Sequence, residues 1–119
     1  MAIKVSNTTV INNSFGIENI KNAQFYSYTL PSNQSQALNP AAGLYQSITL
    51  IGPTTFTESM ADGDQIALMI DATTYAITWP TVSWVSDFGN SPNISTQDTT
   101  HIVFWKQNST LFGARVGAA

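Results

Sequence analysis

The sequence predicts an all-β fold: a single antiparallel β-sandwich or jelly-roll-like domain of about eight strands, with an extended N-terminal arm. Three observations predict it. Apolar and polar residues alternate with period two along most of the chain, as they do in half-buried strands. Clusters of Gly, Pro, Asn and Asp break this alternation at spacings typical of a sandwich or jelly roll. The sequence contains no coiled-coil heptad, internal repeat or convincing amphipathic helix.

Length and composition set the number of domains. A chain of 119 residues is expected to form one hydrophobic core. Apolar residues make up 43% of the chain and aromatic residues 11%, which is enough apolar surface for that core and argues against a disordered chain. We therefore predict an N-terminal arm or edge strand over residues 1–22 and the β-sandwich domain over residues 23–119.

The N-terminal part carries the weakest strand pattern. Residues 3–11 predict a weakly apolar first strand, which ends at the turn-like residues 12–14. Ile17 and Ile20 are three residues apart, a spacing compatible with one helical turn or with a loop that places two anchors in the core. Residues 25–30 predict the second strand, because aromatic and apolar residues are frequent there.

The middle of the chain gives sharper signals. A loop rich in Ser, Asn and Gln is expected over residues 31–43, the longest irregular stretch. Strands are expected over residues 44–50 and 54–58, and residues 62–64 (Asp-Gly-Asp) have the chemistry of a hairpin turn. Residues 66–70 are apolar on both faces, which predicts a central strand.

The C-terminal part predicts a further strand and a hairpin. Residues 75–79 alternate between polar and apolar, and Pro80 ends that strand because it cannot donate to a ladder. Residues 102–105 are apolar on both faces. The turn-like residues 107–109 then lead into residues 111–116, so the last two strands are predicted to pair as a hairpin.

Charged residues are unusually rare. Only 9% of the residues are Asp, Glu, Lys or Arg, against about a quarter in an average soluble domain. Neutral polar residues take their place and can face an identical neighbour without repulsion. The formal net charge is −3 and the four basic residues are scattered, which argues against nucleic acid as a partner: Lys4, Lys21, Lys106 and Arg115.

The sequence predicts no enzyme, no metal and no cofactor. His101 is the one histidine, and a general base also needs a nucleophile and an orienting acid. Asp98 lies three residues away, but catalytic zinc usually needs three protein ligands. Asp62 and Asp64 are interpreted as turn residues, because calcium needs six or more oxygens. The chain has no cysteine to supply a thiolate.

No membrane association is expected. The first residues lack the apolar run of a signal peptide, and no stretch approaches the roughly 18 apolar residues needed to cross a bilayer. We therefore expect a chain that is made in a cytoplasm.

The aromatic residues offer a candidate contact. Trp79 and Trp105 are expected to fill the core or a subunit interface, whereas Trp84 follows Pro80 in a loop and is the better candidate for exposure. Asn and Asp beside it could bind a polar ligand. The candidate loop contact comprises five residues: Trp84, Asp87, Phe88, Asn90 and Asn93.

Several segments share a recognisable pattern: residues 77–80 with Trp-Pro, Trp84, Gly89, Pro92, residues 102–104 and residues 111–113, which end in Phe-Gly. These segments resemble the C-terminal β-domain of bacteriophage tail-fibre and other virion structural proteins. There, a Trp-Pro, a second Trp and a Gly-x-x-Pro loop precede a strand pair that ends in an aromatic-Gly. Residues 3–12 and 18–20 are similar to the openings of tailed-phage structural proteins. Residues 85–88 depart from the resemblance, since a more glycine-rich turn is usual there.

The resemblance implies a non-enzymatic virion subunit, assembled in the host cytoplasm. Fibre proteins usually carry this domain behind a long shaft, so the short chain favours a capsid decoration, cement or fibre-tip protein. Homo-oligomers, often trimers, that dock to capsid or tail proteins are implied. The alternative is a carbohydrate-binding module of a tail fibre that recognises host surface glycan. The docking arm is expected to use seven apolar residues: Ile3, Val5, Val10, Ile11, Phe15, Ile17 and Ile20.

Overall fold

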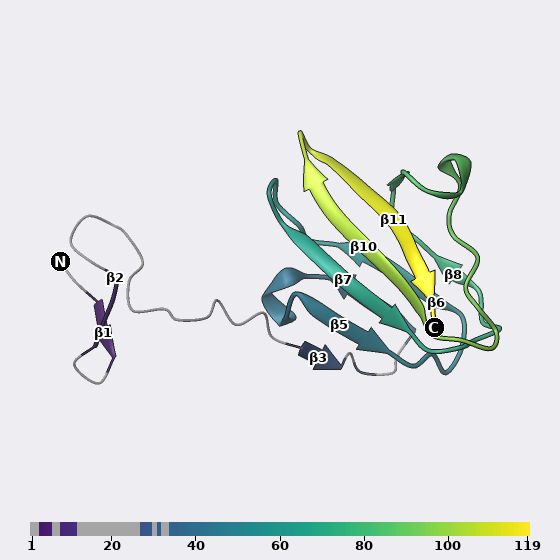
Figure 1. The fold of residues 1–119 in the computed structure, drawn as a ribbon, viewed down its shortest axis with the longest axis horizontal. Coiled ribbons are helices and arrows are strands. Elements are labelled where there is room, and N and C mark those ends of the chain that lie inside the picture. Colours follow the sequence, from purple (N-terminus) through teal and green to yellow (C-terminus); the bar gives the residue numbers. More distant parts are fainter. Residues whose placement is uncertain (1–2, 6–7, 12–26, 30, 32–33) are drawn as a thin grey trace.

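Three β-sheets make up most of the structure, a computed structural model that describes residues 3–5, 8–11, 27–29, 31 and 34–119 (Figure 1). Two short 3₁₀ turns cover Pro40–Ala42 and Asp87–Gly89. The strands are β1 (Ile3–Val5), β2 (Thr8–Ile11), β3 (Ser27–Thr29), β4 (Ser35–Leu38), β5 (Tyr45–Ile48), β6 (Thr54–Glu58), β7 (Gln65–Ile70), β8 (Ile77–Thr78), β9 (Ser83–Trp84), β10 (Thr100–Gln107) and β11 (Thr110–Ala118). The prediction of a mostly β protein is confirmed.

From β3 to β9 the chain changes sheet after every strand. Strands β3, β5, β7 and β9 enter a six-stranded sheet of order β3-β5-β7-β10-β11-β9, which β10 and β11 complete, and β4, β6 and β8 form a three-stranded sheet of order β4-β6-β8. Each crossover to a parallel neighbour therefore passes through a strand of the other sheet. As a result β3–β5, β5–β7, β4–β6 and β6–β8 are all parallel pairs.

The prediction of purely antiparallel sheets is therefore wrong. Antiparallel pairing joins β7 to β10 and β10 to β11 within the six-stranded sheet, whereas β9 pairs with β11 in parallel. The Asp62–Asp64 turn is present, with Gly63 at φ 92° and the Asp64 N–H donating to the Ala61 carbonyl at 3.0 Å. It joins β6 to β7, which lie in different sheets, so its predicted role as a hairpin turn is also wrong.

The other local predictions have mixed outcomes. Strands are confirmed at β6 and β7, and the β10–β11 hairpin is confirmed. The expected single strand over residues 3–11 is instead two strands, β1 and β2, which pair antiparallel. The expected loop over residues 31–43 contains β4, which buries Gln36 and Leu38. The expected strand over residues 75–79 is limited to β8.

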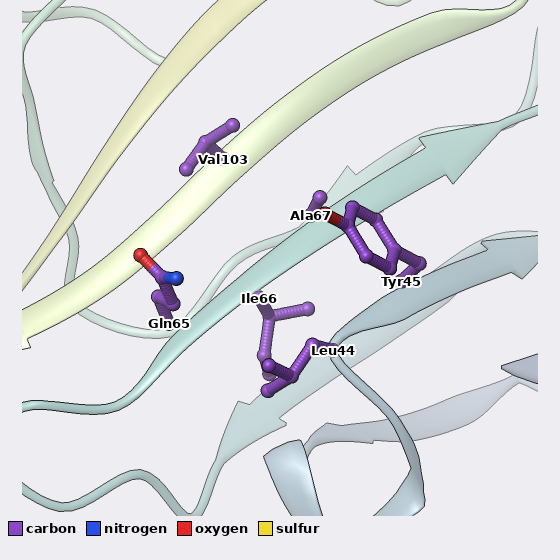
Figure 2. A pocket seen from close by; sticks show the side chains of 6 residues that line it. All are labelled: Leu44, Tyr45, Gln65, Ile66, Ala67 and Val103. Carbon is purple, nitrogen blue, oxygen red and sulfur yellow. The ribbon is translucent and has the colours of Figure 1, made fainter. Parts of the chain in front are cut away.

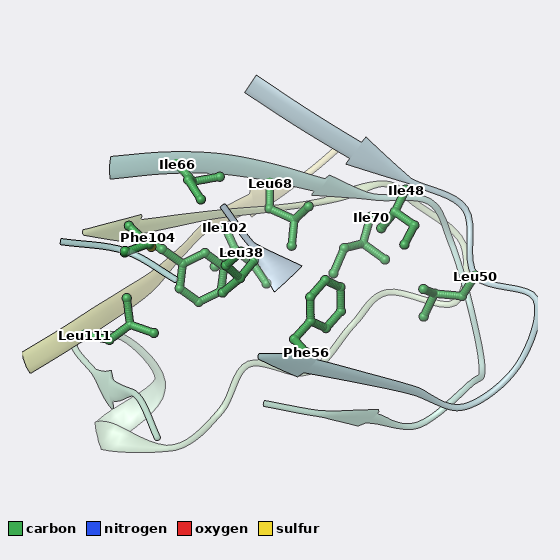
Figure 3. Close-up of a cluster of buried hydrophobic side chains, with 11 residues drawn as sticks. Leu38, Ile48, Leu50, Phe56, Ile66, Leu68, Ile70, Ile102, Phe104 and Leu111 are labelled. Carbon is green, nitrogen blue, oxygen red and sulfur yellow. The ribbon is translucent and has the colours of Figure 1, made fainter. Parts of the chain in front are cut away.

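The hydrophobic core lies between the two larger sheets (Figure 3). Alternate residues of β5, β7 and β10 point inward, as the period of a strand requires. Strands β4 and β6 contribute Leu38 and Phe56 from the opposite side. The buried apolar residues are Leu38, Ile48, Leu50, Phe56, Met60, Ile66, Leu68, Ile70, Ile102, Phe104 and Leu111.

Trp79 connects the core to the region after β8. Its ring centroid lies 5.0 Å from that of Phe56, 5.5 Å from that of Phe104 and 5.6 Å from that of Trp84. Such aromatic contacts stabilise a core beyond the area they bury. Trp79 was expected in the core or in a subunit interface, and the structure packs it, partly buried, against the core cluster.

An ion pair ties the two larger sheets together at one end. The Lys106 ammonium of β10 donates to a Glu58 carboxylate oxygen of β6 at 2.8 Å, and the Met60 N–H donates to the other oxygen at 2.8 Å. These two hydrogen bonds lower the pKa of Glu58 below its usual value of 4.5, and the bond from Lys106 has the larger effect.

We expect Glu58→Gln to lower the free energy of unfolding by about 0.5–1.5 kcal/mol at neutral pH, because it weakens this pair. A lowered folded-state pKa means that the carboxylate contributes its stability above its unfolded-state pKa. That contribution is lost as the pH falls through the lowered folded-state value. Urea denaturation as a function of pH would therefore show the free energies of unfolding of the wild type and Glu58→Gln converging below about pH 4. Asp98→Asn, in an exposed loop, is the control and is expected to change little at any pH.

The β10–β11 turn offers a second test of local structure. Asn108 and Ser109 have φ values of 51° and 61°, the left-handed conformation that a type I′ hairpin turn requires. Glycine adopts this conformation without steric cost, so Ser109→Gly is expected to raise the free energy of unfolding by about 0.5–1 kcal/mol. The Ser109 N–H would still donate to Asp62 Oδ1. Ser83→Gly is the control: it lies in the extended strand β9 and should instead destabilise the protein. Thermal denaturation of both variants and the wild type would measure the two changes.

Candidate functional site

The side of the six-stranded sheet that faces away from the core is unexpectedly apolar. In a two-layer β protein the solvent-facing residues of a strand are usually polar. In this sheet β7 places Ala67 and Met69 on that side, and β10 places Val103 and Trp105 there. We call this surface the outer face. Its residues are Tyr45, Ser47, Gln65, Ala67, Met69, His101, Val103, Trp105, Phe112, Ala114 and Val116.

Strand register arranges these residues in rows across the sheet. Tyr45 of β5 is the partner of Ala67 of β7, which is the partner of Val103 of β10, which is the partner of Ala114 of β11. Figure 2 shows Tyr45, Ala67 and Val103 on three neighbouring strands. The small Ala67 side chain therefore lies between two larger ones.

The outer face is hollowed around Ala67. Two adjoining hollows of about 410 and 220 Å³ share Tyr45, Ala67 and Val103 in their walls. The larger hollow extends over Met69 and His101. The side chains around it project strongly, since Tyr45 is 53% exposed and Val116, the extra residue at the bulge of β11, is 69% exposed.

The outer face also continues as an aromatic pair. The rings of Trp105 and Phe112, partners across β10 and β11, stack at 5.7 Å with an interplanar angle of 15°. Trp105 was expected in the core or in a subunit interface, and the structure places it on the outer face, outside the core cluster.

Among the described residues, charged groups lie at the margin of the outer face or away from it. None of its residues is Asp, Glu, Lys or Arg, and His101 is its one titratable group apart from the Tyr45 phenol. Lys106, the next residue after Trp105, is directed to Glu58 on the other sheet. Asp71, the first residue after β7, accepts a hydrogen bond from the Thr49 hydroxyl at the margin. The surface therefore has an apolar centre with polar groups at its edge.

The predicted loop contact is divided between two places. Asp87, Phe88 and Gly89 form a turn in which all three have positive φ, and the Asn90 side chain donates to the Asp87 carbonyl at 3.1 Å. Phe88 at the tip is fully exposed. Trp84, by contrast, is partly buried, with its ring centroid 5.8 Å from that of Phe104.

Asn93 lies in a different position, at a cleft of about 300 Å³ beside β8. This cleft is lined by the aromatic rings of Tyr75 and Trp79 and by neutral polar residues that include Thr73 and Thr96. The Arg115 guanidinium donates to the Asn93 carbonyl at 3.5 Å. The structure thus brings Asp87, Phe88 and Asn90 together but places Asn93 beside Tyr75 and Trp79, neither of which was predicted as a loop contact.

The acidic residues of the Asp62–Asp64 turn are bound to the backbone. Asp62 accepts the Ser109 N–H and Asp64 accepts the Ala61 N–H, each at 2.8 Å, as expected of turn residues. No group of three or more His, Cys, Asp or Glu that could hold a metal occurs within the described residues. The described residues also contain no helix long and apolar enough to cross a membrane.

The predicted docking arm is described in part. Ile3, Val5, Val10 and Ile11 belong to the β1–β2 hairpin, in which Ile3 is the partner of Ile11. The other three predicted residues, Phe15, Ile17 and Ile20, lie outside the described residues. The arm therefore stays a prediction.

The outer face itself was not predicted from the sequence, although a signal was present. Residues 66–70 and 102–105 are apolar on both faces, and for residues 66–70 this predicted a central strand. The same pattern also means that the side of these strands facing away from the core is apolar. No protein-family model, curated protein or solved structure matches this chain.

Proposed function

We propose that this chain is a non-enzymatic β-sandwich subunit on the surface of a bacteriophage virion, either a capsid decoration or cement protein or a tail-fibre subunit. It acts by assembling with copies of itself and by docking to capsid or tail proteins. The observation that carries the proposal is the outer face, an apolar surface on a chain with very few charges. Apolar surface that is left uncovered on a folded domain typically marks a protein–protein interface.

The sequence supports the virion setting. The resemblance of residues 77–113 to virion β-domains implies a homo-oligomer, often a trimer. In the proposed arrangement residues 23–119 form one sandwich domain of about eight strands, and residues 1–22 form the arm that docks to a neighbour by strand addition.

Mass spectrometry of purified particles tests this function. We expect the chain among the virion proteins of the phage that encodes it, in high copy number for a capsid subunit or low copy number for a tail subunit. Its absence from the particles would contradict the proposal. Deleting residues 1–20 should lower its occupancy on particles, and normal occupancy of the truncated chain would argue against the docking arm.

The second candidate is recognition of host surface glycan. The observation that favours it is the cleft beside β8, where Tyr75 and Trp79 meet uncharged polar residues including Asn93. Sugar rings stack on aromatic rings and bind through neutral hydrogen-bonding groups. Glycan-array binding that is lost in Tyr75→Ala would favour this cleft, and loss in Trp84→Ala would favour the loop predicted from the sequence. If no glycan on the array binds, the glycan-recognition candidate fails and the structural role is favoured.

A further inference from the structure

We propose that the outer face of the six-stranded sheet packs against the same face of a second copy, related by a two-fold axis. This inference rests on the proposed function, since it identifies the partner and the surface of self-assembly. The occupant of the face is a second copy of this chain, and three properties of the outer face support it: its shape, its charge and its size.

The shape of the outer face is self-complementary. Tyr45 projects from β5 next to the hollow that the small Ala67 side chain leaves on β7. In a two-fold interface each residue i that contacts residue j of the partner is matched by the reverse contact. Two facing copies can therefore each place a Tyr45 ring in the hollow over the other's Ala67. Tyrosine is well suited to this role because it buries a large ring and keeps a polar hydroxyl at its end.

The charge of the outer face permits the same pairing. Charged residues tend to be depleted at the centre of protein interfaces and to lie at the rim. The face has no Asp, Glu, Lys or Arg, so two copies would bring no like charges together. The Asp71 carboxylate at the margin keeps a hydrogen bond from Thr49. A partner with a strongly charged surface would lose the hydration of its charged groups at this face and find no opposite charge to pair with them.

The size of the outer face fits a weak dimer. The four strands that carry it, β5, β7, β10 and β11, lie about 4.8 Å apart and are on average about seven residues long at 3.3 Å each, which gives a footprint of roughly 440 Å². Two copies would then bury roughly 900 Å² in total, an area typical of weak, transient interfaces. We therefore expect a dimer that dissociates at micromolar concentrations.

Sedimentation velocity and light scattering of the full chain, over a range of concentrations, test the proposal. The wild-type protein should show twice the 12.9 kDa chain mass at high concentration. Ala67→Lys fills the hollow and brings two ammonium groups together, so it should weaken dimerisation at least about 100-fold. The matched control is Ala37→Lys on the exposed side of β4 in the other sheet, which should dimerise normally.

A second pair of variants tests the interface without a buried lysine, so that the inference does not depend on the folding of Ala67→Lys. Tyr45→Ala should weaken dimerisation about 10-fold, whereas Tyr75→Ala, which truncates a similarly exposed ring elsewhere, should not. Circular dichroism confirms that each variant is folded.

Four outcomes would overturn the inference. These are a wild-type protein that stays monomeric at several hundred micromolar, a wild-type trimer, dimerisation unchanged in both outer-face variants, and equal weakening in the controls. The failure of this inference differs from failure of the proposed function. If the protein is a monomer but is found in purified particles, the dimer inference fails and the virion role stands. If it dimerises through the outer face but is absent from particles, the dimer inference stands and the virion role fails.

Discussion

Replacing Phe104 by alanine is expected to lower the free energy of unfolding by about 3–5 kcal/mol, the largest single effect that we predict. Phe104 is fully buried on β10, in the middle of the six-stranded sheet. Its ring lies against Trp79 and Trp84, and β7 and β11 fix the backbone on both sides. The surrounding residues therefore cannot collapse into the space that the ring leaves. Urea denaturation followed by tryptophan fluorescence would measure the loss.

Phe88→Ala is the matched control, because it removes the same ring from a fully exposed position. Its free energy of unfolding is expected to change by no more than about 0.5 kcal/mol. Since a domain of this kind is typically stable by about 5–15 kcal/mol, Phe104→Ala could leave it only marginally folded. Equal losses in the two variants would contradict a core centred between the two larger sheets.

The second large effect is expected at Gly113. A Cβ atom added there would lie 2.7 Å from Trp84 Cζ3 and 3.0 Å from Val82 Cγ1. The Trp84 ring cannot withdraw easily, because it packs against Trp79 and Phe104. Gly113→Ala is therefore expected to cost about 1–3 kcal/mol by overpacking, measured by the same denaturation assay.

Gly117 on the same strand supplies the control. A Cβ atom at this position would meet no atom within 4 Å, and the residue does not have a positive φ. Gly117→Ala should therefore leave stability within about 0.5 kcal/mol of the wild type. If Gly113→Ala were equally harmless, the Trp84 ring would have to move aside, and that result would contradict its tight packing against Trp79 and Phe104.

The sequence predicted individual strands better than their partners. Residues 66–70 are apolar on both faces, and this local pattern correctly indicated a central strand, β7. Pairing depends on contacts between distant residues, for which a local pattern carries no information. The turn at residues 62–64 illustrates the difference, because its chemistry predicts a reversal of the chain but not whether the next strand joins the same sheet.

Strand β4 was missed for a different reason. Its sequence, Ser-Gln-Ala-Leu, has one strongly apolar residue, and a buried Gln36 was not expected. The Gln36 side chain is nevertheless satisfied, since its amide donates to the Pro31 carbonyl. A polar residue can therefore occupy an inward position of a strand when the backbone offers it an acceptor. The partner of that hydrogen bond cannot be found without the fold.

The candidate site was less predictable from the sequence than the strands were. Of the predicted loop contacts, Asp87, Phe88 and Asn90 share one exposed turn, but Asn93 lies at the cleft beside β8. The outer face combines residues from β5, β7, β10 and β11, which are scattered over residues 45–116 of the sequence. Register across three strands is needed to place Tyr45, Ala67 and Val103 in one row.

The alternation of the chain between two sheets has a consequence for how the protein folds. The β10–β11 hairpin is local and can close within about 1–10 μs. By contrast, Gln36 pairs with Phe56 and Tyr45 with Ala67, 20 and 22 residues apart, and each of these loops includes a strand of the opposite layer. Neither layer can be completed before the other. We therefore expect the hairpin to serve as an early template, after which both layers assemble in one cooperative, comparatively slow step.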